Sequence, residues 1–302
     1  MTEKKYLVFD IGGSSIKYAL MGPDRILKKG DRIRTPKDHR EEFLEILEHI
    51  TGSCQNEIQG IAVSAPGWID RETGQFHHAG ALHYLDGLNL PMILHEATGL
   101  PVTIENDANC AALAELHNGS LRDAENGLVL VIGTGVGAGL VLNHQLYRGS
   151  LGNAGEYGMM ASGYIHASSS VGSLTCAHAL LESYAEMKGM DPEEIRGVTF
   201  FRLAEAGDET ALRALDSYCR ILARSMGSVH SLLDLEVIAI GGGYSREPLF
   251  LDYLNQALDA YCEPFVPLRM RRPKLTLCSY GNDANLFGAL FNHLEQYKKQ
   301  KE

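Results

Sequence analysis

A glycine-rich turn inside an apolar run constrains this sequence more than any other feature. Residues 129–142 read VLVIGTGVGAGLVL, with a glycine at every second position from 133 to 139. The apolar residues on either side predict two strands joined by a tight turn. Because glycine carries no Cβ, a ligand can approach this backbone closely and bind its N–H groups, and a phosphate is the natural candidate. The alternative is a hairpin that simply needs several residues with positive φ.

Two familiar nucleotide-binding loops do not fit this stretch. The chain contains no GxxxxGK[ST] sequence, which excludes a P-loop. A dinucleotide fingerprint leads from a strand into a helix, whereas Gly139 leads directly into the apolar LVL segment of another strand. We therefore expect neither a P-loop nor a Rossmann domain.

Composition and charge exclude several classes of protein. The 302 residues are 45% hydrophobic and 22% charged, which is enough for a large core and two domains. A net charge of −11 argues against nucleic acid as a partner. The start, MTEKKYLVFD, has no signal-peptide core and no apolar run could span a bilayer, so we expect a cytoplasmic protein without a membrane partner. The six cysteines lack any CxxC spacing and are expected to be free, buried thiols.

The order strand, glycine turn, strand occurs twice in the chain. Residues 6–21 show it around Gly12 and Gly13, and residues 126–142 repeat it, which indicates a weak internal duplication. A helix with a capping-box start at Asp38 and Glu41 is expected in the first half. The second half should contain a long helix over residues 210–233. We expect a smaller N-terminal domain of residues 1–119, joined by the C-terminal helix 287–302, and a larger domain of residues 120–286.

Three glycine turns follow directly on strands: DIGGSS at 10–15, GTGVGAG at 133–139 and IGGGYS at 240–245. Three such turns in two similar halves resemble the actin, hexokinase and Hsp70 superfamily. The resemblance implies a two-domain, ribonuclease H-like α/β fold with duplicated mixed sheets and a cleft between the domains. It also implies that two hairpins hold the phosphates of ATP and that the third turn borders the adenosine. The residues that it assigns to ATP are Asp10, Gly12, Gly13, Ser14, Gly133, Thr134, Gly135, Gly137, Gly241, Gly242 and Gly243.

Within that superfamily the chain resembles sugar kinases of the ROK family (repressors, open reading frames and kinases). The motifs that carry the resemblance are DIGGSSIKYAL, VSAPGWID, ENDANCAA, VIGTGVGAGLV, GNAGEYG and IAIGGG, in that order. ROK repressors carry a DNA-binding region ahead of the first motif, but only nine residues precede Asp10 here, so we expect a kinase. Its partner would be a small-molecule sugar. ROK proteins often form dimers, so the resemblance also allows a homodimer as a partner.

The resemblance assigns roles to individual residues. Phosphoryl transfer to a hydroxyl needs a base near the acceptor and a clamp on the phosphates. Asp107 matches the catalytic aspartate, which takes the proton of a sugar hydroxyl, while Asn106 and Glu156 match residues that bind the sugar. The alternatives are that Asp107 is a helix N-cap and that Glu156 is a solvated carboxylate. Gly67 either offers its backbone to the sugar or is a plain turn glycine. Asp10 would lie near the Mg²⁺ that accompanies ATP.

One segment departs from the family pattern. Most ROK kinases carry a His three residues after the sugar-binding Glu and then a zinc motif, CxCGxxGCxE, but here that His is replaced by Met159. The residues at the three cysteine positions and the final Glu position of the motif are His166, Ser168, Ser173 and Thr175. Only His166 among these residues is a possible zinc ligand. A single ligand cannot hold zinc, so we expect no zinc site.

The same departure bears on the substrate. In family glucokinases the missing His and final Glu contact hydroxyls at the anomeric end of the sugar, so their loss should open that end and let it accept a substituted oxygen. Met159 and Thr175 would then line a wider, less polar pocket, with Tyr84 or Tyr164 as a further surface. This resembles β-glucoside kinases, which phosphorylate O6 of a glucose unit in cellobiose and aryl β-glucosides. The alternatives are a kinase for a free hexose or N-acetylhexosamine (glucose, N-acetylmannosamine) and a non-catalytic sugar sensor.

Overall fold

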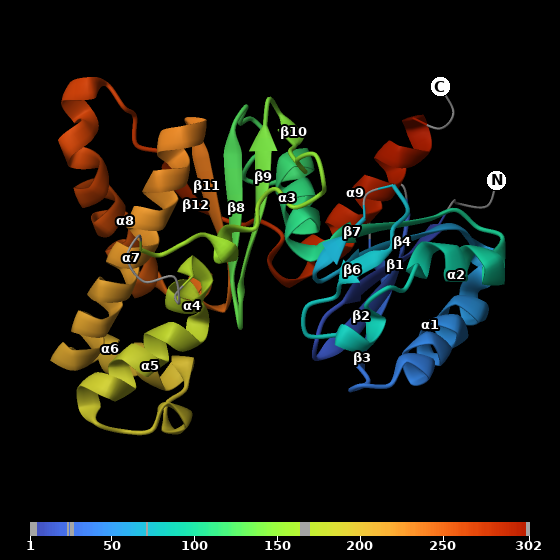
Figure 1. Ribbon diagram of the computed structural model, residues 1–302, viewed down its shortest axis with the longest axis horizontal. Helices are drawn as coiled ribbons and strands as arrows, with labels where there is room; N and C mark the ends of the chain where they lie inside the picture. The colour runs from blue at the N-terminus through green and yellow to red at the C-terminus, as the bar shows by residue number, and fades with distance from the viewer. Residues whose placement is uncertain (1–4, 23, 25–26, 71, 164–169, 300–302) are drawn as a thin grey trace. The chain divides into compact units, whose positions relative to one another are not determined.

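The computed structural model describes residues 5–22, 24, 27–70, 72–163 and 170–299. The chain forms two compact units, each built around a five-stranded sheet (Figure 1). The first unit comprises residues 1–122, 146–154 and 282–302, and the second comprises residues 123–145 and 155–281.

Each unit contains strands and helices in alternation. The strands of the first unit are β1 (Lys5–Ile11), β2 (Ser15–Met21), β3 (Leu27–Arg34), β4 (Ile58–Ala65), β5 (Trp68–Ile69), β6 (Phe76–His78) and β7 (Val102–Asn106). Its helices are α1 (Arg40–Cys54), α2 (Leu90–Thr98), α3 (Asp107–Asn118) and α9 (Ala284–Lys299). The strands of the second sheet are β8 (Gly127–Ile132), β9 (Val136–Leu142), β10 (Gln145–Leu146), β11 (Val237–Gly242) and β12 (Lys274–Leu277). The helices of the second unit are α4 (Val171–Thr175), α5 (Ala177–Lys188), α6 (Gly197–Glu205), α7 (Glu209–Leu233) and α8 (Pro248–Cys262).

The two five-stranded sheets have the same topology. The first has the strand order β3-β2-β1-β4-β7, and the second has the order β10-β9-β8-β11-β12. In each sheet the central strand, β1 or β8, pairs antiparallel with the next strand of the chain and parallel with a later one. The predicted fold with duplicated mixed sheets is therefore confirmed, and the weak sequence repeat corresponds to a repeated topology.

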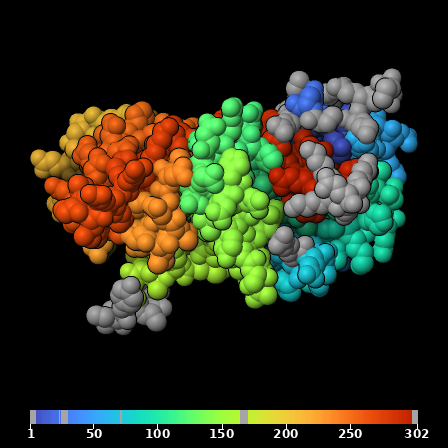
Figure 2. Space-filling view, turned by 90° about the horizontal axis from the view of Figure 1, so that it is seen from above, coloured from blue at the N-terminus to red at the C-terminus, as the bar shows by residue number. Residues whose placement is uncertain are grey.

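Strand β1 shows why helices must cover both faces of the first sheet. Side chains alternate between the two faces of a strand, and residues 6–11 are all buried. Leu7 and Phe9 pack with side chains of α1 and α2 on one face. Tyr6 and Val8 pack with Leu290 of α9 on the other. The C-terminal helix therefore completes the core of the first unit, and Figure 2 shows red atoms of the C-terminal segment beside blue and cyan atoms of this unit.

The segment of residues 146–154 differs from the expected domain division. This segment was expected in the larger C-terminal domain, but it belongs to the first unit. Arg148 Nε donates a hydrogen bond to Glu105 Oε2 at 2.6 Å, and Trp68 Nε1 donates to Leu151 O at 3.1 Å. These contacts join residues far apart in the sequence, so a pass along the chain could not find them.

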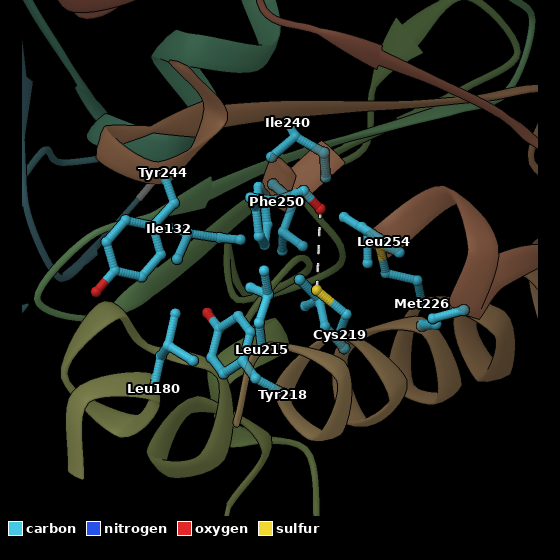
Figure 3. Close-up of a cluster of buried hydrophobic side chains, with 14 of the residues drawn as sticks. Ile132, Leu180, Leu215, Tyr218, Cys219, Met226, Ile240, Tyr244, Phe250 and Leu254 are labelled. Atoms are coloured by element: carbon cyan, nitrogen blue, oxygen red, sulfur yellow. Dashed lines mark hydrogen bonds between the residues drawn. The ribbon is translucent and has the colours of Figure 1, made fainter. Parts of the chain in front are cut away.

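Helix α7 forms the centre of the hydrophobic core in the second unit (Figure 3). Leu215, Cys219 and Met226 lie fully buried along it. They belong to one cluster with Ile240 of β11 and Phe250 of α8, and Cys219 Sγ donates to Phe250 O at 3.9 Å. The predicted long helix is thus confirmed, and its apolar stripe is the face that packs in this core.

The start of α1 differs from the prediction. The capping box of Asp38 and Glu41 does not form, because the N-cap is His39 and makes no side-chain cap hydrogen bond. Asp38 has φ of 59°, in the left-handed region, whereas an N-cap residue is normally extended. The prediction of this cap was therefore wrong.

No helix in the described part of the chain combines the length and apolar character needed to cross a membrane. All six cysteines lie within the described ranges, and no disulfide joins them, as predicted. Four of the six are buried, and burial raises the pKa of the Cys110 thiol well above its usual value. Such a thiol is unreactive at neutral pH.

A buried histidine on α9 couples the stability of the first unit to pH. His293 is 1% exposed, its Nδ1 lies 2.9 Å from Thr103 Oγ1, and its Nε2 has no hydrogen-bond partner among the described residues. Gly60 leaves room for the ring, because a Cβ at that position would lie 2.4 Å from Nε2. Burial lowers the pKa of His293 from 6.5 to about 4, so the folded unit holds a neutral imidazole at neutral pH.

Acidification should therefore destabilise the protein through His293. The pKa is lower in the folded than in the unfolded chain, so this contribution to stability is present above a pH of about 6.5 and is lost as the pH falls toward about 4. Urea titrations at about pH 7 and about pH 5 give the loss in free energy of unfolding on acidification. We expect this loss to be smaller by roughly 2 kcal/mol in His293→Leu than in the wild type. His49→Gln, which changes an exposed histidine of α1, should keep the wild-type pH dependence. The same pH dependence in all three proteins would contradict this assignment.

Candidate active site

The turn between β1 and β2 carries the first group of residues predicted to bind ATP. Gly12 N donates to Ser15 O at 3.0 Å, which closes the turn and leaves Gly13 and Ser14 exposed at its tip. Thr35 supports the turn, because its Oγ1 donates to Gly12 O at 2.6 Å and its N donates to Ser14 O at 3.2 Å. Thr35 was not identified from the sequence, since nothing local marks it as a partner of this turn.

Asp10 lies at the end of β1, next to that turn. The residue is 7% exposed, and its two carboxylate oxygens accept hydrogen bonds from Lys17 Nζ and Asn285 Nδ2, each at 3.0 Å. Lys17 was not identified from the sequence, although the antiparallel register around a tight turn places it opposite Asp10. Carboxylate oxygens have lone pairs for further ligands, so the pair offers an oxygen ligand that suits Mg²⁺ and an ammonium group that suits a phosphate.

The junction of β7 and α3 places Asp107 at the first residue of a helix. The N-cap is Asn106, whose Oδ1 accepts from Ala108 N at 2.9 Å and from Asn109 N at 3.1 Å. The alternative that Asp107 is the N-cap is therefore wrong. Asp107 is half-buried, and its Oδ1 accepts from Ala108 N at 2.8 Å. Its carboxylate thus lies at the helix N-terminus, where the helix dipole favours a negative charge.

Gly67 holds the amide of Asn106. Asn106 Nδ2 donates to Gly67 O at 3.0 Å, which leaves one amide hydrogen for another acceptor. Gly67 has φ of 93°, and a Cβ on it would lie 2.0 Å from His78 O, so no other residue fits. Gly67 is therefore a required turn glycine, and its carbonyl orients the asparagine that was predicted to bind sugar.

Glu105 and Arg148 form a network beside Asn106. Glu105 Oε1 accepts from Asn106 N at 2.9 Å, and its Oε2 accepts from Arg148 Nε at 2.6 Å. Arg148 Nη2 also donates to Asn292 Oδ1 at 3.1 Å. These four residues help to line a cavity of about 180 Å³ within the first unit. Asn106 was the one predicted residue among them, because the others meet only through the tertiary fold.

The second glycine turn joins β8 and β9. Gly133 N donates to Gly135 O at 2.9 Å, and Thr134 and Gly135 are exposed. Neither glycine has a positive φ, so the alternative explanation by backbone conformation was wrong. A Cβ on Gly135 would meet no atom within 4 Å, and on Gly133 the nearest would be 3.9 Å away. Gly137 lies within the ladder, opposite Val131. The tip is therefore open to a ligand, and packing does not require its glycines.

The third glycine turn ends β11. Gly242 has φ of 94°, and a Cβ on it would lie 1.9 Å from Ile132 O, so the fold requires glycine there. A Cβ on Gly241 would lie 3.1 Å from Cys278 Sγ, which leaves little room. Gly243 is exposed and would place its Cβ in open space. The first two glycines serve packing, and the third leaves the backbone open.

Glu156 directly precedes a short 3-10 helix, η3 (Tyr157–Met159), in the second unit. The loop is held on β9, because Gly155 has φ of 93° and a Cβ on it would lie 2.6 Å from Ala138 O. Glu156 is exposed, yet the surrounding protein partly desolvates its carboxyl group and raises the pKa. The side chain makes no hydrogen bond or ion pair within the described ranges, so it can accept hydrogen bonds from a ligand. Met159, which follows Glu156 by three residues, is 73% exposed.

The described part of the zinc-motif region makes other interactions. The residues His166, Ser168 and Tyr164 lie outside the described residues. Ser173 forms a capping box with Ser170 at the start of α4. Thr175 is fully buried and its Oγ1 donates to Val171 O at 2.7 Å, so the prediction that it lines the anomeric end of the pocket was wrong. Two hydroxyl groups engaged in this way do not fit a zinc site.

A separate group of metal-binding side chains lies in the first unit. One ligand atom from each of His78, His83 and Asp86 lies within 4.8 Å of the others. The two rings stack with centroids 5.2 Å apart, and Asp86 Oδ1 accepts from Ala79 N at 2.7 Å. This exposed group could bind a divalent metal, but it is not at the position of the family zinc motif.

Comparison with known proteins matches residues 6–295 to the ROK family. The chain belongs to this family. A beta-glucoside kinase of Listeria monocytogenes is 32% identical over 303 residues, which cover 98% of this chain and 100% of that protein. The ROK relationship that the motifs predicted is therefore confirmed over nearly the whole chain.

Solved structures of similar proteins share the fold. A candidate N-acetylmannosamine kinase from Listeria monocytogenes has a TM-score of 0.88 and 32% identity, covering 97% of this chain and 99% of that one. A ROK family protein from Streptococcus pneumoniae in complex with sucrose has a TM-score of 0.87 and 31% identity, covering 98% and 99%. The predicted actin/hexokinase-like fold and the prediction of a carbohydrate kinase are confirmed.

Two glycine substitutions should separate ligand binding from folding. Gly135→Ala adds a methyl group in open space at a permitted φ, so we expect an unchanged melting temperature but a KM for ATP raised about fivefold or more, because the methyl group would meet the phosphates. Gly242→Ala should lower the melting temperature, since its Cβ would overlap Ile132 O. Thermal melts and ATP titrations of both variants provide the measurement. An unchanged KM for ATP in Gly135→Ala would show that this turn does not hold the phosphates.

Proposed function

We propose that this protein is an ATP-dependent sugar kinase that transfers a phosphoryl group to the 6-hydroxyl of a glucose unit, with β-glucosides such as cellobiose as its substrates. The observation that carries the proposal is the position of Asp107 at the first residue of α3, beside an asparagine whose amide is already oriented. A base and a hydroxyl-binding group are thus held next to each other. The 32% identity to a beta-glucoside kinase supports the substrate class.

On the acceptor side, Asp107 takes the proton from the attacking 6-hydroxyl as the bond from the hydroxyl oxygen to the γ-phosphorus of ATP forms and the bond from that phosphorus to ADP breaks. The remaining amide hydrogen of Asn106 donates to a neighbouring sugar hydroxyl, and the helix N-terminus keeps the carboxylate of Asp107 in place. Glu156 accepts a hydrogen bond from another hydroxyl of the same sugar.

On the donor side, ATP with Mg²⁺ supplies the phosphoryl group and neutralises part of its charge. Asp10, which accepts a hydrogen bond from Lys17, is the oxygen ligand that we assign to the metal, and we assign the Lys17 ammonium group to a phosphate. The turn at Gly12 to Ser14 and the turn at Gly133 to Gly135 offer backbone N–H groups to the phosphates. The open backbone at Gly243 borders the adenosine.

The substrate preference rests on Met159. By the resemblance to ROK glucokinases, a histidine at this position would contact the anomeric end of the sugar, whereas the exposed Met159 offers no hydrogen bond and leaves space for a substituent. The alternative, a kinase for a free hexose or N-acetylhexosamine, is favoured by the similarity to the candidate N-acetylmannosamine kinase. Zinc has no role in this proposal. We place the reaction in the cytoplasm, and a homodimer stays a prediction.

A sugar panel tests the proposal directly. We expect ADP release with cellobiose and methyl β-glucoside, and a larger kcat/KM for cellobiose than for glucose or N-acetylmannosamine, because the second ring adds binding energy in the transition state. A coupled assay at one ATP concentration gives the comparison. A clear preference for a free monosaccharide would reject the β-glucoside assignment, and no turnover with any of these sugars would reject the kinase.

Asp107→Asn should remove the base while keeping the fold. We expect kcat to fall about a hundredfold or more, with sugar binding by calorimetry and the melting temperature near the wild-type values. Glu96→Gln, a change of an exposed carboxylate on α2, is the control and should keep full activity. Turnover near the wild-type rate in Asp107→Asn would assign the base to another residue.

A further inference from the structure

Trp68 is the only tryptophan of the chain, and it is 36% exposed. Its ring lies over that of His77, with centroids 4.3 Å apart and planes inclined by 36°. Its Nε1 donates to Leu151 O at 3.1 Å. One ring face and the N–H edge of the indole therefore contact the protein, and part of the ring remains open to solvent.

The support beneath the indole is itself held in place. His77 Nε2 lies 3.4 Å from Asp70 Oδ2. Hydrogen bonds from Thr73, above all from its backbone N–H, lower the pKa of Asp70 to about 2, so this carboxylate is charged at neutral pH. A single exposed apolar side chain needs no functional explanation, but the orientation of this one is determined by a ring contact and a hydrogen bond.

Trp68 also lies next to the proposed sugar site. It follows Gly67, whose carbonyl accepts the hydrogen bond from Asn106, and consecutive Cα atoms are about 3.8 Å apart. Leu151, whose carbonyl accepts the indole N–H, is 70% exposed and adds apolar surface. Tyr84, which the sequence analysis considered as a further surface, instead donates to Pro36 O at 2.9 Å.

We propose that Trp68 forms the subsite for the group attached to the glucose unit, so that the second ring of cellobiose or an aryl group stacks on its open face. Aromatic side chains provide large, rigid apolar surfaces, and small-molecule sites combine such surfaces with a few oriented polar groups. This inference rests on the proposed function. It makes Trp68 a residue that distinguishes glucosides from free glucose.

Intrinsic fluorescence tests the subsite without relying on catalysis. Because Trp68 is the only tryptophan, emission excited in the indole band reports on this side chain alone. We expect saturable changes in the intensity or wavelength of emission with cellobiose, and a smaller change with methyl β-glucoside or glucose. Binding of cellobiose that calorimetry detects without a change in emission would overturn the proposal.

Kinetics of Trp68 variants provide the second test. Trp68→Ala should lower kcat/KM for cellobiose about three- to tenfold and change the value for glucose by less than about twofold. Trp68→Phe keeps a ring without the N–H donor and should retain most of the discrimination. Tyr147→Ala, in the same segment and at a side chain that is 48% exposed, is the control and should behave as the wild type.

The possible failures are distinguishable. Equal losses for cellobiose and glucose in Trp68→Ala would overturn the subsite while leaving the kinase activity intact. The absence of turnover with all sugars would reject the proposed function, and the fluorescence titration would still decide whether a disaccharide contacts Trp68.

Discussion

The hydrogen bonds of the Asn106 side chain connect the parts of the first unit on which the proposed chemistry depends. Its Oδ1 closes the N-terminus of α3, and its Nδ2 binds the carbonyl of Gly67. The strand end, the helix start and the loop are therefore fixed together. Glu105 strengthens this arrangement, because it accepts a hydrogen bond from the backbone N–H of Asn106 and another from Arg148. The orientation of Asp107 thus follows from a network of neighbours, which is what the proposed role as general base requires.

The glycines in the predicted site divide into two physical classes. Gly67 and Gly242 have positive φ and face a backbone carbonyl so closely that a Cβ cannot fit. Gly135 and Gly243 have neither constraint, since open space lies where their Cβ would be. The fold alone requires the glycines of the first class, whether or not a ligand binds. The second class has no such explanation within the described residues, which is why it supports the proposed contact with ATP more strongly.

The sequence allowed the fold to be predicted because its signals were local. Continuous apolar runs located β1 and β8, apolar residues at helical spacing located α7, and three glycine turns after strands identified the superfamily. The residues that were missed act through contacts distant in the sequence. Thr35 supports a turn more than twenty residues before it, and Arg148 donates to Glu105, which lies 43 positions earlier in the chain. Lys17 could have been found, because the register of a hairpin with a tight turn places it opposite Asp10.

The wrong predictions share a cause as well. The capping box at Asp38 was assigned from residue type and spacing, and the pocket position of Thr175 from the resemblance to the ROK motif, in both cases without knowledge of backbone conformation or burial. Asp38 is left-handed, and Thr175 is fully buried. In both cases a polar side chain that is compatible with a motif is constrained by the structure around it. Residue type alone cannot separate these outcomes, because threonine and aspartate are common in both settings.

The described residues on either side of the start of α4 hold one another through hydrogen bonds and close packing. Helix α4 starts with the capping box of Ser170 and Ser173, and the hydroxyl group of Tyr218 on α7 donates to the carbonyl of Thr175 at its end. Gly172 packs on η3 so closely that a Cβ on it would lie 2.9 Å from Gly158 O. Hydrogen bonds and backbone packing thus position η3 and α4. Their order follows from contacts within the second unit, and Glu156, which directly precedes η3, is held next to them.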